Sequence, residues 1–509
     1  MMIAALVVVP ILAGLLLFVL PRSAQSAAKW IGATLGLGAF AVAALNYGTP
    51  DETLVWLHRP FTATFHIALD GPGFWLVLLL TLVTGCATMV SRVPRGRDFV
   101  AQMLVLQGAM TGVFVARDLM LFALFWDLML LPVFLTLVAW APSAAPDGEQ
   151  PVRARGTVAS PTAWRYLIYN LVGGLALLLA TAAYGIVQGT TDVIGRDPHS
   201  LATISDAWSL WIFAGFAFAF LIKTPVWPLH TWMPETYAAL PAPMAAVVSA
   251  VQSKAGLYGF IVIGLTILPG PMHVAAPLMF VLGLIGLLYG AFAALVQDDT
   301  KRVVAYSSLS HLGLILLAIF SFDPIAIGGA VVYLVAHGLF SAGLFMTIGE
   351  VEAREDTRLL SRLGGLGARN PRLAGGLTIV MLAALGLPGL CGFAGEILIL
   401  TGLYRAGYLW QTVVALVPVV IAAAYMVRLF QGVMQGPEID DLPQREDMSP
   451  LEMLALAPIV VAIVVLGVDP GAVARSAMPA GSAVAHVAAP GAVMASYSAS
   501  GQPMQTRAK

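Results

Sequence analysis

The stretch FLIKTPVWPLHTWMPETYAALPAP, residues 220–243, decides the fold. An apolar run that should form a helix reaches Lys223 and then meets prolines, which remove backbone donors and break helices. A second apolar run is interrupted at LGLPGLCGFAGE, residues 385–396, which ends on Glu396. Two broken apolar helices, each with an ionisable residue beside the break, are typical of an inverted-repeat transporter.

The composition around these stretches is that of a membrane protein. The chain has 509 residues, of which 59% are hydrophobic and 10% charged, and its mean hydropathy is +0.88. Soluble domains carry about 25% charged residues. The sequence therefore predicts an all-α integral membrane protein. Window hydropathy predicts about 14 spans, at residues 2–20, 30–46, 73–91, 98–115, 118–140, 165–187, 208–229, 240–266, 273–296, 302–321, 325–348, 373–403 (interrupted), 409–432 and 450–468.

Basic residues gather in every second connection between these spans, and this alternation predicts the topology. One set of connections carries Arg22, Lys29, Arg92, Arg95, Arg97, Arg153, Arg155, Arg165, Lys301, Arg302, Arg354, Arg358, Arg362, Arg369 and Arg372, and the other carries Arg59, Arg117, Arg196 and Arg405. Because short cytoplasmic loops are rich in Lys and Arg, the N-terminus is predicted to lie outside. No basic region precedes the first span, so we expect a retained helix rather than a cleaved signal.

Charge, cysteine content and motifs argue against several other classes of protein. The net charge is −1 and no basic aromatic stripe occurs, which argues against nucleic acid as a partner. Cys86 and Cys391 lie in apolar runs without a CxxC motif, so we expect no disulfide, iron–sulfur or zinc site. The chain has no Rossmann or P-loop fingerprint, so we expect no cofactor and no redox chemistry in the chain itself.

Four ionisable residues fall inside predicted spans. Lys223 and Lys254 lie in apolar runs, Asp127 lies in the middle of the fifth span, and Glu396 follows the second break. A charged residue at the bilayer centre costs about 2.5–3.5 kcal/mol on insertion scales, so such residues usually have a function. A Lys–Asp pair that opens and closes can switch the lysine between holding and releasing a proton.

Histidines near these charges are candidates for a relay. His311 and His337 lie within spans, and imidazole titrates close to neutral pH. His230 and Asp118 are auxiliary candidates, although His230 could be a capping or solvent-exposed residue and Asp118 a local partner of Arg117. The alternative for all the buried charges is a purely structural role as polar contacts between helices.

The chain is predicted to divide into an N-terminal three-helix region, two inverted repeats, a last span and a tail without regular structure. The connections at 142–164 and 51–73 are expected to be loops, the second ending in an Asp-Gly-Pro turn. The predicted boundaries are 1–97, 98–266 (spans four to eight), 267–435 (spans nine to thirteen), 436–470 and 471–509.

Six segments carry a resemblance to a known family: FWDLMLLPVF (125–134), FLIKTPVWPLHTWMPETYAALPAP (220–243), SKAGLYG (253–259), DDTKRVVAYSSLSHLGLI (298–315), AHGLFSAGLF (336–345) and LGLPGLCGFAGEILIL (385–400). In this order, over about residues 65–435, they resemble the antiporter-like subunits of respiratory complex I. Those subunits are similar to subunits of multisubunit sodium/proton antiporters and membrane-bound hydrogenases. The resemblance implies a bundle of about 14 helices with two inverted five-helix repeats.

The resemblance also implies a role in a proton pathway for each residue at a matching motif position. These residues are Asp127, the fifth-span carboxylate; Lys223, the pumping lysine that pairs with it; Lys254, the linking lysine; His311 and His337, of the central polar axis; and Glu396, the outlet carboxylate.

Two features favour the M-type branch of this family. Glu396 stands where the L and N subunits and the main antiporter subunits carry lysine, and the chain stops soon after its fourteenth span, without a lateral helix. One residue departs from the pattern, because the family normally has glutamate at position 127. The aspartate is shorter by about 1.5 Å, so we expect a weaker pair with Lys223.

The resemblance implies a proton-translocating subunit of NADH:quinone oxidoreductase in the bacterial cytoplasmic membrane. NADH, FMN, iron–sulfur clusters and quinone are then expected in partner subunits, and the partners are the L and N subunits, small membrane subunits and the lipid bilayer. The alternative is a subunit of a multisubunit cation/proton antiporter or a membrane-bound hydrogenase.

Overall fold

The computed structural model describes residues 2–21, 25–140, 161–194, 205–437 and 446–476, and these are almost entirely helical. Within these ranges, thirteen helices are long and apolar enough to cross a membrane. One further predicted span, the twelfth, is present as two shorter helices. The predicted helical membrane class is confirmed. The two inverted repeats and the domain boundaries remain predictions.

The first half of the bundle contains one hairpin and the helices up to the eighth span. Its elements are α1 (Met2–Val19), α2 (Gln25–Leu45), β1 (Glu52–Leu57), β2 (Ala63–Ile67), α3 (Gly71–Met89), α4 (Gly96–Val115), α5 (Leu119–Leu128), α6 (Leu130–Trp140), α7 (Pro161–Gln188), α8 (Asp206–Lys223), α9 (Met233–Ala239), α10 (Ala242–Ala250), η3 (Gln252–Lys254), α11 (Ala255–Gly259), η4 (Phe260–Gly264) and α12 (Leu265–Ile267).

The second half continues with longer helices. Its elements are α13 (Pro269–Leu295), α14 (Thr300–Phe320), α15 (Pro324–Glu355), η5 (Leu360–Arg362), α16 (Leu366–Arg369), α17 (Pro371–Ala384), α18 (Cys391–Arg405), α19 (Leu409–Met434), α20 (Pro450–Val468) and α21 (Gly471–Ser476).

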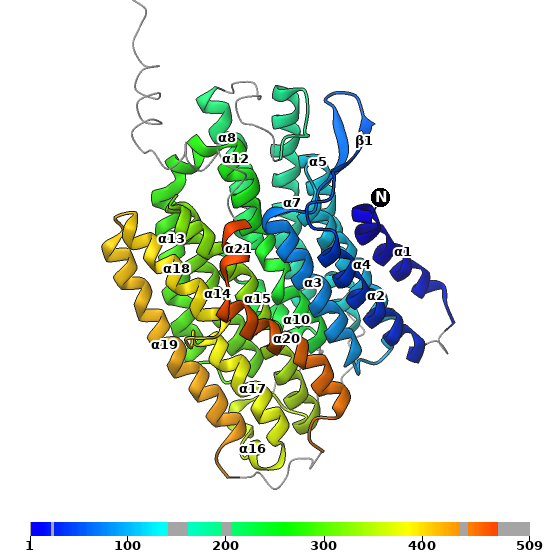
Figure 1. Ribbon diagram of the computed structural model, residues 1–509, viewed down its shortest axis with the longest axis vertical. Helices are drawn as coiled ribbons and strands as arrows, with labels where there is room; N and C mark the ends of the chain where they lie inside the picture. The colour runs from blue at the N-terminus through cyan, green and yellow to red at the C-terminus, as the bar shows by residue number, and fades with distance from the viewer. Residues whose placement is uncertain (1, 22–24, 141–160, 195–204, 438–445, 477–509) are drawn as a thin grey trace, which may run out of the picture.

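Helices from both halves meet at the centre of the bundle. α10, α14 and α15 run through its middle, whereas α1 and α2 lie at one edge and α19 at the other (Figure 1). The most apolar stretch of α15 is completely buried inside the bundle, whereas only 33% of the most apolar stretch of α1, and of that of α19, is buried. The charged residues of the central helices are therefore shielded by protein.

Both predicted breaks are confirmed. α8 ends at Lys223, where the amide of Thr224 closes the last turn on the carbonyl of Phe220, and α9 begins only at Met233. The second break lies between α17 and α18. The prolines and glycines in these stretches explain both interruptions.

A third break, in the eighth span, was not predicted. The sequence indicated a continuous helix over 240–266, but α10 ends at Ala250 and Lys254 lies in a 3₁₀ turn, followed by a π-helical turn. The carbonyl of Ser249 accepts hydrogen bonds from the side chains of Lys254 and Ser253. Two side-chain donors therefore take the place of a helical amide at this carbonyl, and neither Gly nor Pro marks the break.

The expected loop at 51–73 is wrong in part, because it contains an antiparallel β-hairpin. β1 and β2 pair from Glu52 opposite Ile67, with an irregularity after Val55. Their sequences, ETLVWL and ATFHI, are rich in β-branched and aromatic residues, which favour strands. The hairpin projects from one end of the bundle (Figure 1), which we call the hairpin face.

One histidine ties this hairpin to the connection that follows α7. His66 Nδ1 lies 2.6 Å from Asp192 Oδ1, and His66 Nε2 lies 3.1 Å from Asp51 Oδ2. The hydrogen bond with Asp192 and the weaker one with Asp51 raise the pKa of His66 above its usual value, although burial opposes this shift. The hairpin is therefore anchored by contacts that favour a protonated imidazole.

The opposite end of the bundle, which we call the basic face, carries many of the arginines and lysines of the predicted inward connections. Most of those described there are paired with carboxylates: Arg302 with Glu235 (2.9 Å), Lys301 with Glu352 (2.7 Å), Arg358 with Asp299 (2.6 Å) and Arg354 with both Glu350 (2.5 Å) and Glu452 (2.8 Å). Asp299 also caps α14 by accepting from the amides of Lys301 and Arg302.

The chain beyond the last span begins with a helix. The sequence predicted no regular structure from residue 471, and this is wrong for Gly471–Ser476, which form α21. The buried side chain of Val473 packs α21 into the bundle. Residues 477–509 and most of the predicted loop at 142–164 lie outside the described residues.

Candidate functional site

The six predicted pathway residues lie on elements that meet inside the bundle. Asp127 is half-buried at the end of α5, and the other five are buried, with exposed fractions of 9% or less. They are Lys223 on α8, Lys254 in η3, His311 on α14, His337 on α15 and Glu396 on α18.

The predicted Asp127–Lys223 pair is open in this structure. Lys223 Nζ lies 5.0 Å from the centroid of the Trp126 ring. Among the described residues, neither Lys223 Nζ nor Asp127 Oδ1 has a hydrogen-bond partner. The carboxylate of Asp127 instead lies against Gly174 of α7, where any Cβ would overlap Oδ1. Gly174 thus leaves room for the carboxylate of Asp127, and the sequence analysis missed this glycine.

Lys254 joins the two halves of the bundle through hydroxyl groups. Its ammonium donates to the carbonyl of Ser249, and the Ser249 hydroxyl hydrogen-bonds that of Ser341 on α15. The rings of His311 and His337 follow, with centroids 5.4 Å apart. Lys254 interacts electrostatically with both histidines. The structure therefore brings Lys254 and the two histidines into one buried region, and their role as a relay stays a prediction.

Glu396 is the one carboxylate of the group with a fixed partner. Its Oε1 accepts a 2.5 Å hydrogen bond from the hydroxyl of Tyr333 on α15. Its Oε2 faces Gly386 in the break, a residue with φ of +72° whose added Cβ would overlap that oxygen. The sequence analysis missed Tyr333, although it lies four residues before His337 and so on the same face of a helix.

We call the series of residues from Asp127 to Glu396 the line. Several buried polar atoms along it have no protein partner within the described residues. They are Lys223 Nζ, Gln252 Oε1, His311 Nδ1 and both ring nitrogens of His337. Buried polar atoms are normally satisfied by protein or ordered water, and leaving one unsatisfied costs about 1–3 kcal/mol. These atoms are therefore polar groups that the described protein leaves without hydrogen bonds.

The two auxiliary candidates, Asp118 and His230, differ in their hydrogen-bond partners. Asp118 is the N-cap of α5 and accepts from the amides of Met120 and Leu121, and its Oδ2 accepts from the amide of Thr64 and the hydroxyl of Thr191. These bonds give Asp118 a structural role, and its expected pairing with Arg117 is wrong, because Arg117 pairs with Asp70. His230 lies in the first break with its Nδ1 unpartnered among the described residues.

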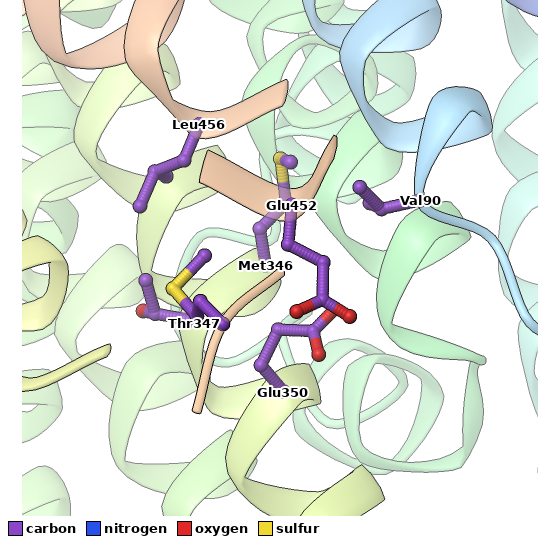
Figure 2. A pocket seen from close by; sticks show the side chains of 7 residues that line it. Val90, Met346, Thr347, Glu350, Glu452 and Leu456 are labelled. Carbon is purple, nitrogen blue, oxygen red and sulfur yellow. The ribbon is translucent and has the colours of Figure 1, made fainter. Parts of the chain in front are cut away.

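A small cavity on the basic face does not belong to this line. Its volume of about 10 Å³ fits about one water molecule. The carboxylates of Glu350 and Glu452 reach it from α15 and α20 (Figure 2). Since both acids pair with Arg354, the cavity is part of an ion cluster that fixes the last span. Within the described residues, no group of three metal-ligating side chains could hold a metal.

Comparison with known proteins identifies the family. The family model described as "NADH:quinone oxidoreductase/Mrp antiporter, TM" matches residues 116–422. The chain belongs to this family. All six pathway residues lie inside the matched range of the NADH:quinone oxidoreductase/Mrp antiporter family.

Individual family members are similar over almost their whole length. The chain is 30% identical over 506 residues to NADH-quinone oxidoreductase subunit M of Rhodobacter capsulatus, covering 94% of each chain. It is 31% identical to subunit M of Pseudomonas aeruginosa, covering 91% of this chain and 94% of that one. The predicted resemblance to the M-type branch is therefore confirmed.

Solved structures of the family support the fold. A chain of respiratory complex I from Thermus thermophilus with bound NADH matches with a TM-score of 0.84 and 29% identity, covering 95% of this chain and 99% of that one. A chain of the Mrp complex from Dietzia sp. matches with a TM-score of 0.79 at 19% identity, covering 97% and 98%. The second match shows the shared fold alone.

Proposed function

We propose that this chain is a proton-translocating membrane-arm subunit of an NADH:quinone oxidoreductase. The observation that supports it most is the buried line from Asp127 to Glu396 in a chain whose relatives are named subunit M of that enzyme. By this proposal the donor and acceptor chemistry takes place in other subunits. NADH, FMN, iron–sulfur clusters and quinone are bound there.

The proposed pathway starts at the open pair. When the carboxylate of Asp127 moves from Gly174 towards Lys223, the ammonium form of the lysine is stabilised. When the carboxylate withdraws, the desolvated ammonium loses that stabilisation and gives up its proton. The state with the carboxylate against Gly174 is therefore the proton-releasing state.

From Lys223 the proton passes towards the second half of the bundle. The neutral amine of Lys254 and then the unpartnered nitrogens of His311 and His337 offer successive positions that can take up the proton. Glu396 receives the proton at the second break. Each transfer moves one proton and leaves one vacancy behind, so the next proton can enter at Lys223 when the pair closes again.

The proposed setting is the bacterial cytoplasmic membrane, with the N-terminus and the hairpin face outside. The partners are the L and N subunits and small membrane subunits of the same complex. A second candidate is a subunit of a cation/proton antiporter, since the description of the matching family includes the Mrp antiporters. Glu396, in place of the lysine that the main antiporter subunits carry, argues against it.

Lys223→Ala tests the proposal. In the assembled complex, reconstituted in liposomes, we expect the number of protons pumped per NADH oxidised to fall, because the first proton carrier is lost. Lys29→Ala is the matched control, since Lys29 lies on α2, away from the line. Wild-type stoichiometry in the Lys223 variant would contradict the proposed function. A sodium requirement for transport would favour the antiporter.

A further inference from the structure

The hydroxyl of Tyr333 makes a short hydrogen bond to the carboxylate at the end of the line. The oxygen atoms of Tyr333 and Glu396 are 2.5 Å apart, and both side chains are buried. Among the described residues, Tyr333 is the one hydrogen-bond donor to Glu396. Hydrogen bonds to an ionised acceptor are shorter and roughly twice as strong as neutral ones, and this distance falls in the range of O–H···O⁻ bonds.

Tyr333 also packs against one of the two histidines. Its ring lies edge-on to that of His311, with centroids 5.7 Å apart, and His337 follows one helical turn later on α15. Tyr333 therefore contacts both a histidine and the carboxylate of Glu396.

Close packing of α15 against α18 fixes the bond. A Cβ added at Gly395, the residue before Glu396, would lie 2.7 Å from the Cβ of Tyr333. At Gly329, one turn before Tyr333, it would lie 2.8 Å from the backbone nitrogen of Ile399. Two glycines thus bring the helices into contact on either side of the bond, so the geometry between hydroxyl and carboxylate is set by the backbone.

A purely structural tyrosine in this protein looks different. The hydroxyl of Tyr258 is also buried, and it donates to the backbone carbonyl of Phe114 at 2.8 Å. That bond satisfies two groups that never change charge. The bond of Tyr333 instead ends on the one ionisable residue of the second break, whose charge must change if it carries a proton.

We propose that Tyr333 is a positioning residue that gives the two carboxylate oxygens of Glu396 different roles. The inference rests on the proposed function, since it assumes that Glu396 carries protons. Tyr333 holds Oε1 by a bond that is stronger to the ionised carboxylate, and so promotes proton release. Oε2, which faces Gly386 in the break, is the atom that takes up and gives off the proton.

The proton balance of this step is simple. Tyr333 keeps its own O–H bond throughout and donates to Oε1 both before and after the transfer. One proton binds to Oε2 from the side of the histidines and leaves from the same oxygen into the break. Glu396 is therefore neutral only between these two events.

Tyr333→Phe removes the hydroxyl and leaves the ring. We expect proton pumping by the complex in liposomes to slow about tenfold, because a charge-assisted hydrogen bond shifts the balance between ionised and protonated carboxyl by about that factor. In infrared difference spectra of the whole complex, we expect the C=O band of protonated Glu396 to move to higher frequency, since its carbonyl oxygen loses a donor. Loss of the band in Glu396→Gln identifies it.

Two further variants separate the possible outcomes. Tyr258→Phe removes a buried hydroxyl elsewhere and should leave the band unmoved. In a Glu396→Gln background, Tyr333→Phe should slow pumping no further, because its effect acts through the carboxylate. If Glu396→Gln itself pumps normally, the proposed function fails. If Glu396→Gln slows pumping but Tyr333→Phe leaves rate and band unchanged, or slows the double variant as much as the wild type, the role of Tyr333 is refuted.

Discussion

Asp127→Glu lengthens the carboxylate arm that faces Lys223 by one methylene, about 1.5 Å. In the structure the two side chains are not in contact, and no hydrogen-bond acceptor reaches Lys223 Nζ within the described residues. The longer side chain should therefore bring the pair to ion-pair distance. The same extension in Asp206→Glu, at the exposed start of α8, is the matched control.

The size of the effect follows from Coulomb's law. At an effective dielectric constant of about 20, an ion pair at about 4 Å is worth about 4 kcal/mol, and about 1.5 Å of extra separation reduces this to about 3 kcal/mol. Closing this gap strengthens the hold of the carboxylate on the ammonium by about 1 kcal/mol, or about fivefold. Asp127→Asn removes the charge, and with it most of the roughly 3 kcal/mol of the longer pair.

The assay is the rate of proton uptake by liposomes that contain the purified complex, started with NADH. We expect Asp127→Glu to pump up to about fivefold more slowly, because Lys223 must leave a stronger pair, and Asp127→Asn to lose at least tenfold. A structure of the Asp127→Glu complex should show the ion pair within 4 Å. Pumping at the wild-type rate in Asp127→Asn would refute the pairing, and a still open pair in Asp127→Glu would refute the argument from side-chain length.

Three further predictions concern the surroundings of the site. Gly174→Ala should slow pumping by pushing the Asp127 carboxylate out of its place, whereas Gly173→Ala, whose Cβ would meet its neighbours at an ordinary 3.5 Å, should not. Asp118→Ala should lower the stability of the chain by about 3 kcal/mol, measured by thermal unfolding, because a helix cap and two more hydrogen bonds are lost. Because the folded-state pKa of His66 is raised, its anchoring of the hairpin should be complete below about pH 6.5 and should weaken as the pH rises through the folded value. Lower protection factors of the hairpin amides at pH 8.5 than at pH 6, after correction for the intrinsic pH dependence of amide exchange, check this, and His66→Gln should show no such difference.

The sequence predicted the features that depend on composition and on strong local signals. Apolar runs gave the span positions to within a few residues, and prolines or glycines marked the breaks after Lys223 and before Glu396. The break at Lys254 carries no such signal. It arises because the lysine side chain donates back to the carbonyl of Ser249, and this contact exists only once the lysine is buried. A hydropathy window cannot detect such a contact.

The residues that the sequence analysis missed belong to no sequence motif, and they contact the two carboxylates only in the folded chain. Gly174 and Gly386 were two of 50 glycines in the chain, and only the fold places each against a carboxylate. Tyr333 was one aromatic residue in an apolar helix until α18 brought Glu396 to its hydroxyl. A spacing rule could have singled out Tyr333, since it shares a helix face with His337. No local pattern connects position 174 with position 127.

The two ends of the line use the same arrangement for opposite purposes. At each end a carboxylate lies against a glycine that leaves room for one oxygen. Asp127 lies against Gly174 of α7, and Glu396 lies against Gly386 in the second break. Asp127 has no protein donor to its Oδ1 among the described residues and so is free to move towards Lys223. Glu396 is held by Tyr333 and so can only exchange a proton in place. Under the proposed function, a movable acid at the entrance and a fixed acid at the exit would give proton transfer a direction, because only the entrance would respond to a conformational signal from outside the chain.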